Sequence, residues 1–194
     1  MAEPTSDVEL MLRVKHGDRE AFRLLVQRHR KPLINFIYRF TGNSGESEDL
    51  AHEVFIKVFR SASRYEPRAA FSTWLYRIAT NLALNYLRDH RPQLATSLDW
   101  GSEEEDRSRT ELRDKMTLVE DQLLAQERVE QIRQALAALP ENQRLAVVLT
   151  KYQELSLKEA AEVMKCSEAA VKSLIFRAYT TLRQKLITVV ESRV

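Results

Sequence analysis

The sequence predicts an all-α protein made of two small helical domains joined by a flexible acidic linker. Hydrophobic residues make up 44% of the chain and charged residues 30%, a balance typical of helical domains with an apolar core. Only four Gly and five Pro are present, which is little material for a turn-rich β fold. Apolar residues instead recur at three- and four-residue steps, the spacing that places them on one face of a helix.

Charge divides the chain into blocks. Residues 13–91 contain 15 basic and 8 acidic residues, whereas residues 101–130 contain 10 acidic and 5 basic residues. The net charge of +2 therefore conceals a basic first part, which favours a polyanion as partner, followed by an acidic segment. We expect one domain over residues 1–92, a linker over 93–126 and a second domain over 127–194.

The first part of the chain has the pattern of consecutive amphipathic helices. Ser6 and Glu9 have the spacing of a capping box, and Asp18 can cap the following helix. Pro32 lies inside this second apolar pattern and predicts a kink or a break. A third helix is expected to open with carboxylates near Glu46, at the positive end of its dipole. Its predicted core side consists of Leu50, Val54, Phe55, Val58 and Phe59.

The helix expected over residues 73–91 carries most of the chemistry of this domain. Ser72 can act as its N-cap, and an apolar face starts at Trp74. Arginines neutralise phosphates, an amide can pair with base edges, and an aromatic ring can stack on an unpaired base. An ordinary amphipathic helix with a basic exposed face, and with Trp74 in the core, is the alternative. The second, polar face consists of Thr73, Arg77, Asn81, Leu84, Arg88 and Arg91.

Beyond the linker, a helix is expected up to Pro140, a second helix follows it, and residues 156–187 have the pattern of a helix-turn-helix. Ser156 and Glu159 form a capping box, and Ser167 can cap the next helix after a short turn. The second helix of such a motif enters the major groove of DNA. A packed helical hairpin with a solvated basic face is the alternative, against which an exposed Phe176 argues. The exposed side is expected to carry Glu168, Ala169, Lys172, Ser173, Phe176, Arg177 and Arg183.

Residues for catalysis or metal binding form no recognisable pattern. His52 and Glu53 lack a second His at the metalloprotease spacing, and no Gly-rich phosphate-binding loop is visible. Cys166 is interpreted as a small packed side chain. We therefore expect no enzymatic activity, no metal, no cofactor and no small-molecule substrate. A single Cys, no signal peptide and no apolar run near about 18 residues predict a cytoplasmic protein without membrane insertion.

Four segments in order resemble bacterial RNA polymerase sigma factors of the extracytoplasmic-function (ECF) group, in the sigma-70 family. They are DLAHEVFIKVFR, FSTWLYRIATNLALNYLR, ALPENQRLAVVLTKY and the helix-turn-helix. The resemblance covers residues 18–91, as sigma domain 2, and residues 127–187, as sigma domain 4. It implies a sigma factor that binds core RNA polymerase and directs promoter-specific, DNA-dependent transcription initiation.

The resemblance also implies three sets of contacts. In the family, the helix that here holds Asp49, Glu53 and Phe55 docks on the largest subunits of core polymerase. Residues corresponding to contacts with the −10 promoter element, where the duplex melts, are Arg68, Ser72, Thr73, Trp74, Arg77, Asn81 and Arg88. Residues corresponding to contacts with the −35 element are Lys151, Glu168, Ala169, Ala170, Lys172, Ser173, Phe176 and Arg177.

Further partners and departures follow from the same resemblance. Promoter DNA and an anti-sigma factor are expected partners, and the acidic run 103–106 is expected to be either a tether or a mimic of nucleic acid inside polymerase. Many relatives carry Gly-Thr-Val and Arg-Ser-Arg where this chain has Ala169-Ala170-Val171 and Lys172-Ser173-Leu174, which leaves the base preference open. Leu174 is expected to pack rather than to contact DNA.

Two other functions remain as alternatives. A helix-turn-helix transcriptional regulator would bind duplex DNA without being a polymerase subunit, usually at symmetric half-sites. A nucleic-acid enzyme would need clustered carboxylates or metal ligands on a basic face, and the sequence shows none.

Overall fold

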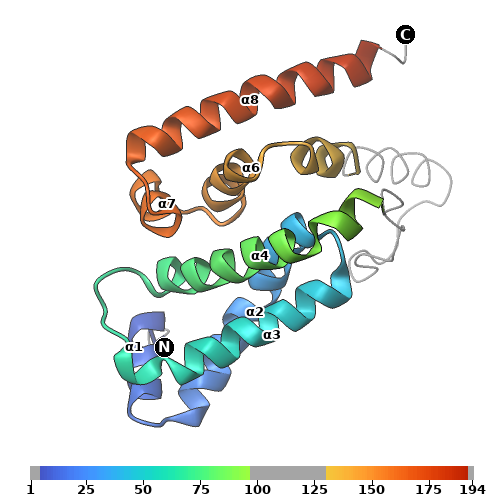
Figure 1. Ribbon diagram of the computed structural model, residues 1–194. Coiled ribbons are helices and arrows are strands. Elements are labelled where there is room, and N and C mark those ends of the chain that lie inside the picture. Colours follow the sequence, from blue (N-terminus) through green and yellow to red (C-terminus); the bar gives the residue numbers. More distant parts are fainter. Residues whose placement is uncertain (1–4, 97–129, 192–194) are drawn as a thin grey trace, which may run out of the picture.

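The computed structural model describes residues 5–96 and 130–191, which form two helical units stacked on one another (Figure 1). These residues contain no strand, so the all-α prediction is confirmed. Most of the predicted linker, including the acidic run 103–106, lies outside the described residues. The N-terminal unit consists of α1 (Asp7–Lys15), α2 (Arg19–Thr41), α3 (Ser44–Arg60), the 3₁₀ turn η1 (Ala62–Arg64) and α4 (Phe71–Thr96).

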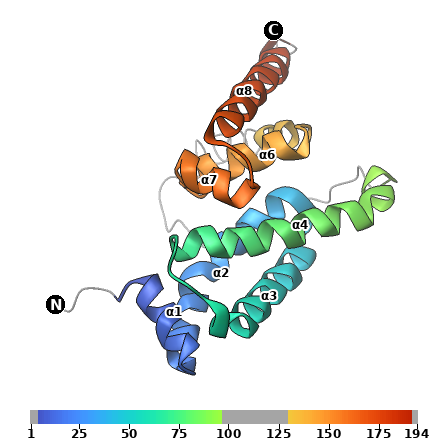
Figure 2. The same cartoon turned by 60° about the vertical axis from the view of Figure 1, so that its left-hand side comes forward.

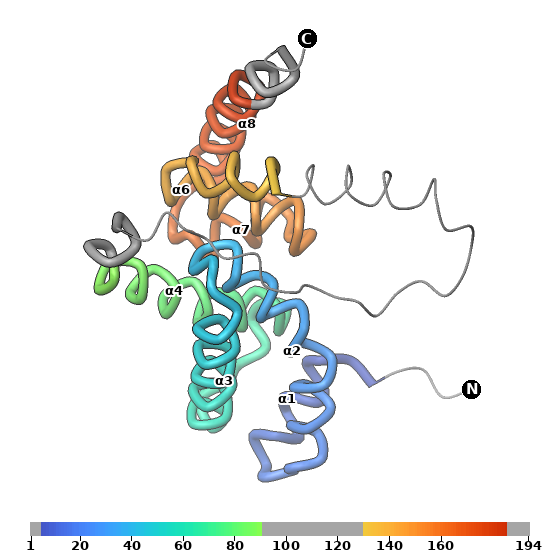
Figure 3. The backbone as a smooth tube through the Cα atoms, turned by 90° about the vertical axis from the view of Figure 1, so that its right-hand side faces the viewer, coloured from blue at the N-terminus to red at the C-terminus, as the bar shows by residue number. Residues whose placement is uncertain are grey.

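The C-terminal unit is the predicted helix-turn-helix together with the helices that precede it. Helix α8 lies on the far side of α6 and α7 from α4, as Figures 1 and 3 show. The members of this unit are the helical residues 130–137, α6 (Glu141–Val147), the π-helical turn η2 (Val148–Tyr152), α7 (Leu157–Met164) and α8 (Glu168–Glu191).

Local capping signals predicted the starts of α1, α2, α7 and α8 correctly. The Glu9 N–H donates to Ser6 Oγ over 3.2 Å, and the Ser6 N–H donates back to Glu9 Oε2 over 2.9 Å. The Ala21 N–H donates to Asp18 Oδ1 over 3.0 Å, which caps α2. Each of these caps provides a partner for a backbone group that the first turn of a helix leaves unpaired.

The predicted start of α4 is wrong, and of the kink or break predicted at Pro32 the break does not occur, because tertiary packing decides both. Helix α4 begins at Phe71 rather than at Thr73, since the buried Phe71 ring packs on His29, 5.1 Å between ring centroids. Helix α2 runs without a break through Pro32. Leu33 and the other buried residues after the proline continue the same apolar face into the core, which offsets the lost backbone hydrogen bond.

Helix α4 is the central element, lying between α2 and α3 on one side and α7 on the other (Figure 2). Leu75 and Ala79 of α4 are fully buried, and the buried cluster to which they belong also includes Leu149 and Val163 of the C-terminal unit. The two units therefore share one hydrophobic core, and apolar burial of this kind is the main force that holds packed helices together.

The turn between α7 and α8 has left-handed backbone at Lys165, where φ is 54°. Its N–H donates to the carbonyl of Ala161, and the Ala170 N–H donates to Ser167 Oγ over 3.2 Å, so the predicted cap of α8 is present. Cys166 is exposed, so its interpretation as a packed side chain is wrong. A left-handed residue turns the chain sharply outward here, which directs the thiol to the surface.

Candidate nucleic-acid interface

Helix α4 presents a polar edge whose long side chains reach solvent. Arg77, Asn81 and Arg88 are exposed at intervals of one or two turns. Arg88 donates a hydrogen bond to Asn85 Oδ1. The loop before the helix carries Arg68, whose guanidinium lies 2.6 Å from Glu66 Oε2 in a solvent-exposed pair. Two cations spaced along an exposed edge with an amide between them can neutralise phosphates and pair with a base edge.

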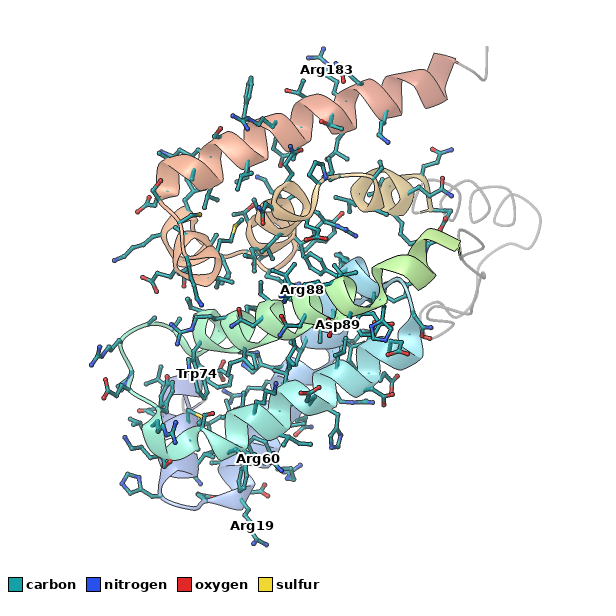
Figure 4. All side chains as sticks on the ribbon, viewed as in Figure 1. Arg19, Arg60, Trp74, Arg88, Asp89 and Arg183 are labelled. Atoms are coloured by element: carbon teal, nitrogen blue, oxygen red, sulfur yellow. The ribbon has the colours of Figure 1, made fainter. Side chains whose placement is uncertain are left out.

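Trp74 packs partly in the core and leaves part of its ring available for stacking, the two roles between which the sequence did not decide. Its ring is half-buried and lies 5.0 Å from the ring of Tyr65 and 6.1 Å from that of Phe71, measured between centroids. The side chain extends from the start of α4 into the N-terminal unit and away from α8 (Figure 4). The remaining exposed surface of the indole, held rigid by two aromatic neighbours, is a surface on which a base can stack.

Thr73 differs from the rest of the expected −10 set. It is only 3% exposed, because α7 covers it, and its hydroxyl donates to Glu159 Oε1 over 3.4 Å. The expectation that Thr73 belongs to an exposed face of α4 is therefore wrong for this arrangement. Ser72, its neighbour, is half-buried. Sequence periodicity could not show this, since the covering helix lies 86 residues further along the chain.

Helix α8 presents the second candidate surface. Phe176 is 74% exposed. An aromatic ring with this exposure, on a helix that also carries cations, marks an interaction site. Arg183 extends outward on the side of α8 away from α4 (Figure 4). Leu174 is half-buried against the core, which confirms that it packs. The other exposed members of the set are Glu168, Ala169, Lys172, Ser173 and Arg177 on α8 and Lys151 in η2, while Ala170 is half-buried.

The α2–α3 face holds the residues expected to contact polymerase, and a groove runs along it. Asp49 and Glu53 are exposed, whereas Phe55 is buried and belongs to the core. Phe59, expected in the core, is 46% exposed and lies at the groove together with Ile56. The groove has a volume of about 470 Å³.

The sequence analysis did not identify Ile56 as a binding candidate, and it assigned Phe59 to the core. An apolar residue at helical spacing has the same pattern whether it faces a core or the rim of a groove. The exposure of these two large apolar side chains is the structural signal that separates them from Phe55.

Among residues 5–96 and 130–191, no three His, Cys, Asp or Glu side chains gather as a metal site. Within the same described ranges, no helix is long and apolar enough to cross a membrane. Glu159, in the capping box of α7, is one of the titratable groups with a shifted pKa. Hydrogen bonds from the Ser156 side chain and backbone, and a smaller contribution from Thr73, hold the pKa of Glu159 below its ordinary value.

A helix-turn-helix unit with a basic, aromatic second helix, packed on a second helical unit with a basic edge, defines a DNA-binding protein. Comparison with known families gives matches to Sigma-70 region 2 over residues 25–93 and to Sigma-70 region 4 over residues 129–182. The ECF RNA polymerase sigma-E factor of Haemophilus influenzae is 36% identical over 188 residues, covering 96% of this chain and 98% of that protein. The RNA polymerase sigma-H factor of Pseudomonas aeruginosa is 35% identical, covering 96% of both chains.

Solved structures show the same fold. CnrH, solved in complex with the cytosolic domain of CnrY, matches with a TM-score of 0.71 at 23% identity, covering 95% of this chain and 99% of that one. The sigma factor RpoE of Bartonella quintana, solved with the anti-sigma factor NepR, matches with a TM-score of 0.62 at 21% identity, covering 85% and 96%. The chain belongs to the ECF group of sigma-70 family RNA polymerase sigma factors, which are transcription initiation factors.

Proposed function

We propose that the three surfaces divide the work of initiation among them. The exposed edge of α4, with Arg68, Trp74 and Asn81, holds the melted −10 element, and α8 contacts the −35 duplex. The α2–α3 groove, lined by Asp49, Ile56 and Phe59, binds core RNA polymerase together with the exposed Glu53 on the same helix. The observation that carries the proposal is that α8 and α3 lie on opposite sides of α4, so a bound polymerase leaves α8 accessible (Figures 1 and 2).

The groove suits a helical partner better than nucleic acid. Its floor is apolar, with Phe22, Val26 and Ile34 facing Ile56 and Phe59. Its rim carries both signs of charge, because Arg30 and Glu48 lie on it, with Arg30 Nη2 3.3 Å from Glu48 Oε2. An amphipathic helix can bury its apolar face in such a groove and pair with both kinds of rim charge.

The two duplex-facing sets on α8 differ in what they contribute. Lys172 and Arg177 are cations that contact phosphates irrespective of sequence, whereas Phe176 offers apolar surface to a thymine methyl group. We therefore assign base preference to Phe176 and Ser173 and general affinity to the cations. Lys replaces the bidentate donor Arg expected at position 172, which weakens discrimination for guanine.

An anti-sigma protein and a cytoplasmic location complete the proposal. Both matched structures are complexes of a sigma factor with a bound protein, named as an anti-sigma factor in the Bartonella complex. A protein that binds core polymerase must be in the same compartment as polymerase, which is the cytoplasm. No catalytic group is assigned to this chain, and the phosphodiester chemistry belongs to polymerase.

Transcription with purified core polymerase on promoter fragments tests the proposal. We expect specific transcripts only when the chain is present, and their loss with Phe176→Ala on linear duplex templates. Tyr86→Phe, which alters a residue outside all three surfaces, should transcribe like the parent. Tight, sequence-specific footprints at symmetric half-sites without polymerase would instead support a helix-turn-helix regulator.

A further inference from the structure

Helix α1 contributes no residue to the three proposed surfaces, yet its contacts lead to both ends of the loop that carries Arg68. The match to Sigma-70 region 2 begins only at residue 25, after this helix. Tyr65 opens the loop after η1, and Phe71 follows it as the first residue of α4. These two rings are the aromatic neighbours of Trp74, so whatever holds them also determines where the indole of Trp74 lies.

At the first end of the loop, Lys15 of α1 holds the backbone of Tyr65. Lys15 Nζ donates to the carbonyl oxygen of Tyr65 over 2.9 Å. Tyr65 is buried, and its hydroxyl has no hydrogen-bond partner among the described residues, so packing and the backbone hold the ring in place of its own polar group. A hydrogen bond from a charged donor is roughly twice as strong as a neutral one. The Lys15 contact therefore restricts this end of the loop.

At the second end of the loop, α1 acts through His29 of α2. His29 Nε2 donates to Asp7 Oδ2 over 2.6 Å, and the same imidazole packs on the ring of Phe71, 5.1 Å between centroids. The Asp7 carboxylate is itself fixed, since Arg28 Nη1 donates to Asp7 Oδ1 over 2.9 Å. The His29 side chain is only 14% exposed, which leaves the ring little room for another orientation. A hydrogen bond at one nitrogen orients an imidazole, so Asp7 fixes the surface on which Phe71 packs.

The two sets of contacts come together at Asp7. Burial and, to a smaller extent, the Asp7 carboxylate raise the pKa of the Tyr65 hydroxyl, which shows that the carboxylate lies near Tyr65 as well as near His29. Helix α1 lies at the end of the N-terminal unit away from α8 (Figures 1 and 2). These contacts are therefore independent of how the C-terminal unit packs on α4.

We propose that α1 braces Trp74, with Asp7, Lys15 and His29 as positioning residues that hold the indole in the orientation in which it receives a base of the melted −10 strand. The brace rests on the proposed function, because it supports a ring that this function assigns to the strand. A side chain that is already immobile loses less conformational freedom on binding than a mobile one, so a base that stacks on a braced ring is held more tightly. The three positioning residues achieve this without touching DNA.

Motion of the Trp74 ring in the free chain tests the brace without DNA. The chain has two tryptophans, so Trp100→Phe leaves Trp74 as the only one. The fluorescence anisotropy of this protein should decay only with the tumbling of the chain. Lys15→Met and His29→Ala should each add a fast component from local motion of the indole, on the nanosecond timescale or below. Lys15→Arg keeps the donor and should decay like the parent, and because Lys15 is exposed, both of its replacements should fold.

His90→Ala is the matched control for His29→Ala. The His90 ring also packs on an aromatic side chain, 4.1 Å from that of Tyr86 between centroids, and its Nδ1 lies 2.9 Å from the Tyr86 carbonyl oxygen. It lies toward the other end of α4 from Trp74, so the decay should not change. An unchanged decay in Lys15→Met or in His29→Ala would overturn the assignment of that residue to the brace.

A double-mutant cycle on strand binding tests whether the brace acts through Trp74. The holoenzyme formed from this chain and core polymerase is titrated against a fluorescein-labelled fork template with a single-stranded −10 element. Lys15→Met and His29→Ala should each weaken binding by about two- to tenfold. The same changes in a Trp74→Leu protein should have no further effect, because the ring that they position is absent. Losses that persist in full in the Trp74→Leu protein would overturn positioning through Trp74.

Failure of the proposed function gives a different result. In that case Trp74→Leu alone leaves the affinity for the fork template unchanged, while the anisotropy decay of Trp74 still responds to Lys15→Met and His29→Ala.

Discussion

The guanidinium of Arg39, near the end of α2, lies 4.1 Å from the ring centroid of Tyr152 in η2. Arg39 Nη1 also donates to the carbonyl of Asn35 over 2.6 Å, which holds the guanidinium in place over the ring. The contact joins the two helical units at their outer margin, where Tyr152 is 39% exposed. A cation over an aromatic face at such a partly exposed site contributes about 0.5–1 kcal/mol.

A double-mutant cycle should detect this contact. Arg39→Ala and Tyr152→Ala should each lower the free energy of unfolding, and together they should lower it by about 0.5–1 kcal/mol less than the sum, because one interaction is lost twice. Urea unfolding followed by circular dichroism provides the measurement. Arg19→Ala is the control, since Arg19 lies at the opposite end of α2 (Figure 4), and it should be additive with Tyr152→Ala. Additivity of the first pair would contradict the contact.

The packing of the two helical units should weaken at alkaline pH, because the Tyr76 hydroxyl of α4 donates to Gln153 of the C-terminal unit. Burial raises the pKa of Tyr76 from 10.0 to about 12. A raised pKa means that the folded chain favours the protonated phenol, so this contribution to stability is present below about pH 10 and is lost as pH rises toward about 12. Urea unfolding of parent and Tyr76→Phe at several pH values should show the parent losing more stability over that interval. A constant difference between the two proteins would contradict it.

Charge reversal on α3 should separate polymerase binding from folding. Asp49→Lys with Glu53→Lys should weaken association with core polymerase, because it changes the charge at one margin of the groove, while the helical content stays unchanged. Glu53 Oε1 lies 3.0 Å from Lys57 Nζ in an exposed pair, and such pairs contribute only about 0–1 kcal/mol to stability. Fluorescence anisotropy with core polymerase measures the association.

Glu20→Lys is the matched control for this reversal. Glu20 also belongs to an exposed pair, 2.6 Å from Arg23 Nη2, but it lies at the start of α2 and away from α3, whose Asp49 lines the groove. It should therefore leave the affinity for core polymerase unchanged. Normal core binding by the Asp49→Lys/Glu53→Lys protein at physiological salt would show that this surface has been misassigned.

Asn81 and Arg88 should affect promoter opening differently. Loss of a base-specific pair of hydrogen bonds in Asn81→Ala should weaken open-complex formation by about 1–3 kcal/mol at one base position. Arg88→Ala should lower the salt dependence of binding for all sequences alike. A 2-aminopurine base in the −10 element, whose fluorescence rises when it leaves the stack, follows the opening. An unchanged rise with Asn81→Ala would exclude that residue from base capture.

Sequence patterns predicted what neighbours along the chain decide. The capping boxes at Ser6 and Ser156, the buried side of α3 at Leu50 and Val54, and the helix-turn-helix all depend on residues within a few positions of one another. Helical period and cap chemistry are sufficient for such features. The same local rules placed Arg77 and Asn81 on an exposed edge.

The junction between the two units could not be predicted in this way. Thr73 is covered by a helix that no local pattern connects to it. Tyr152 lies in the π-helical turn η2, a departure from regular helix that the sequence pattern does not indicate, and it is 39% exposed. Periodicity assumes a regular helix with one buried side, and both assumptions fail where two units meet.

The separation of 77 positions between Tyr76 and Gln153 also sets an order of events during synthesis. A ribosome adds about 5–20 residues per second, so about 4–15 s pass between the two halves of this hydrogen bond. From the completion of α4 at Thr96 until Gln153 is added, α4 has been translated and its partner in the C-terminal unit has not. The face of α4 that α7 covers in the finished protein is therefore uncovered in every nascent chain during this interval.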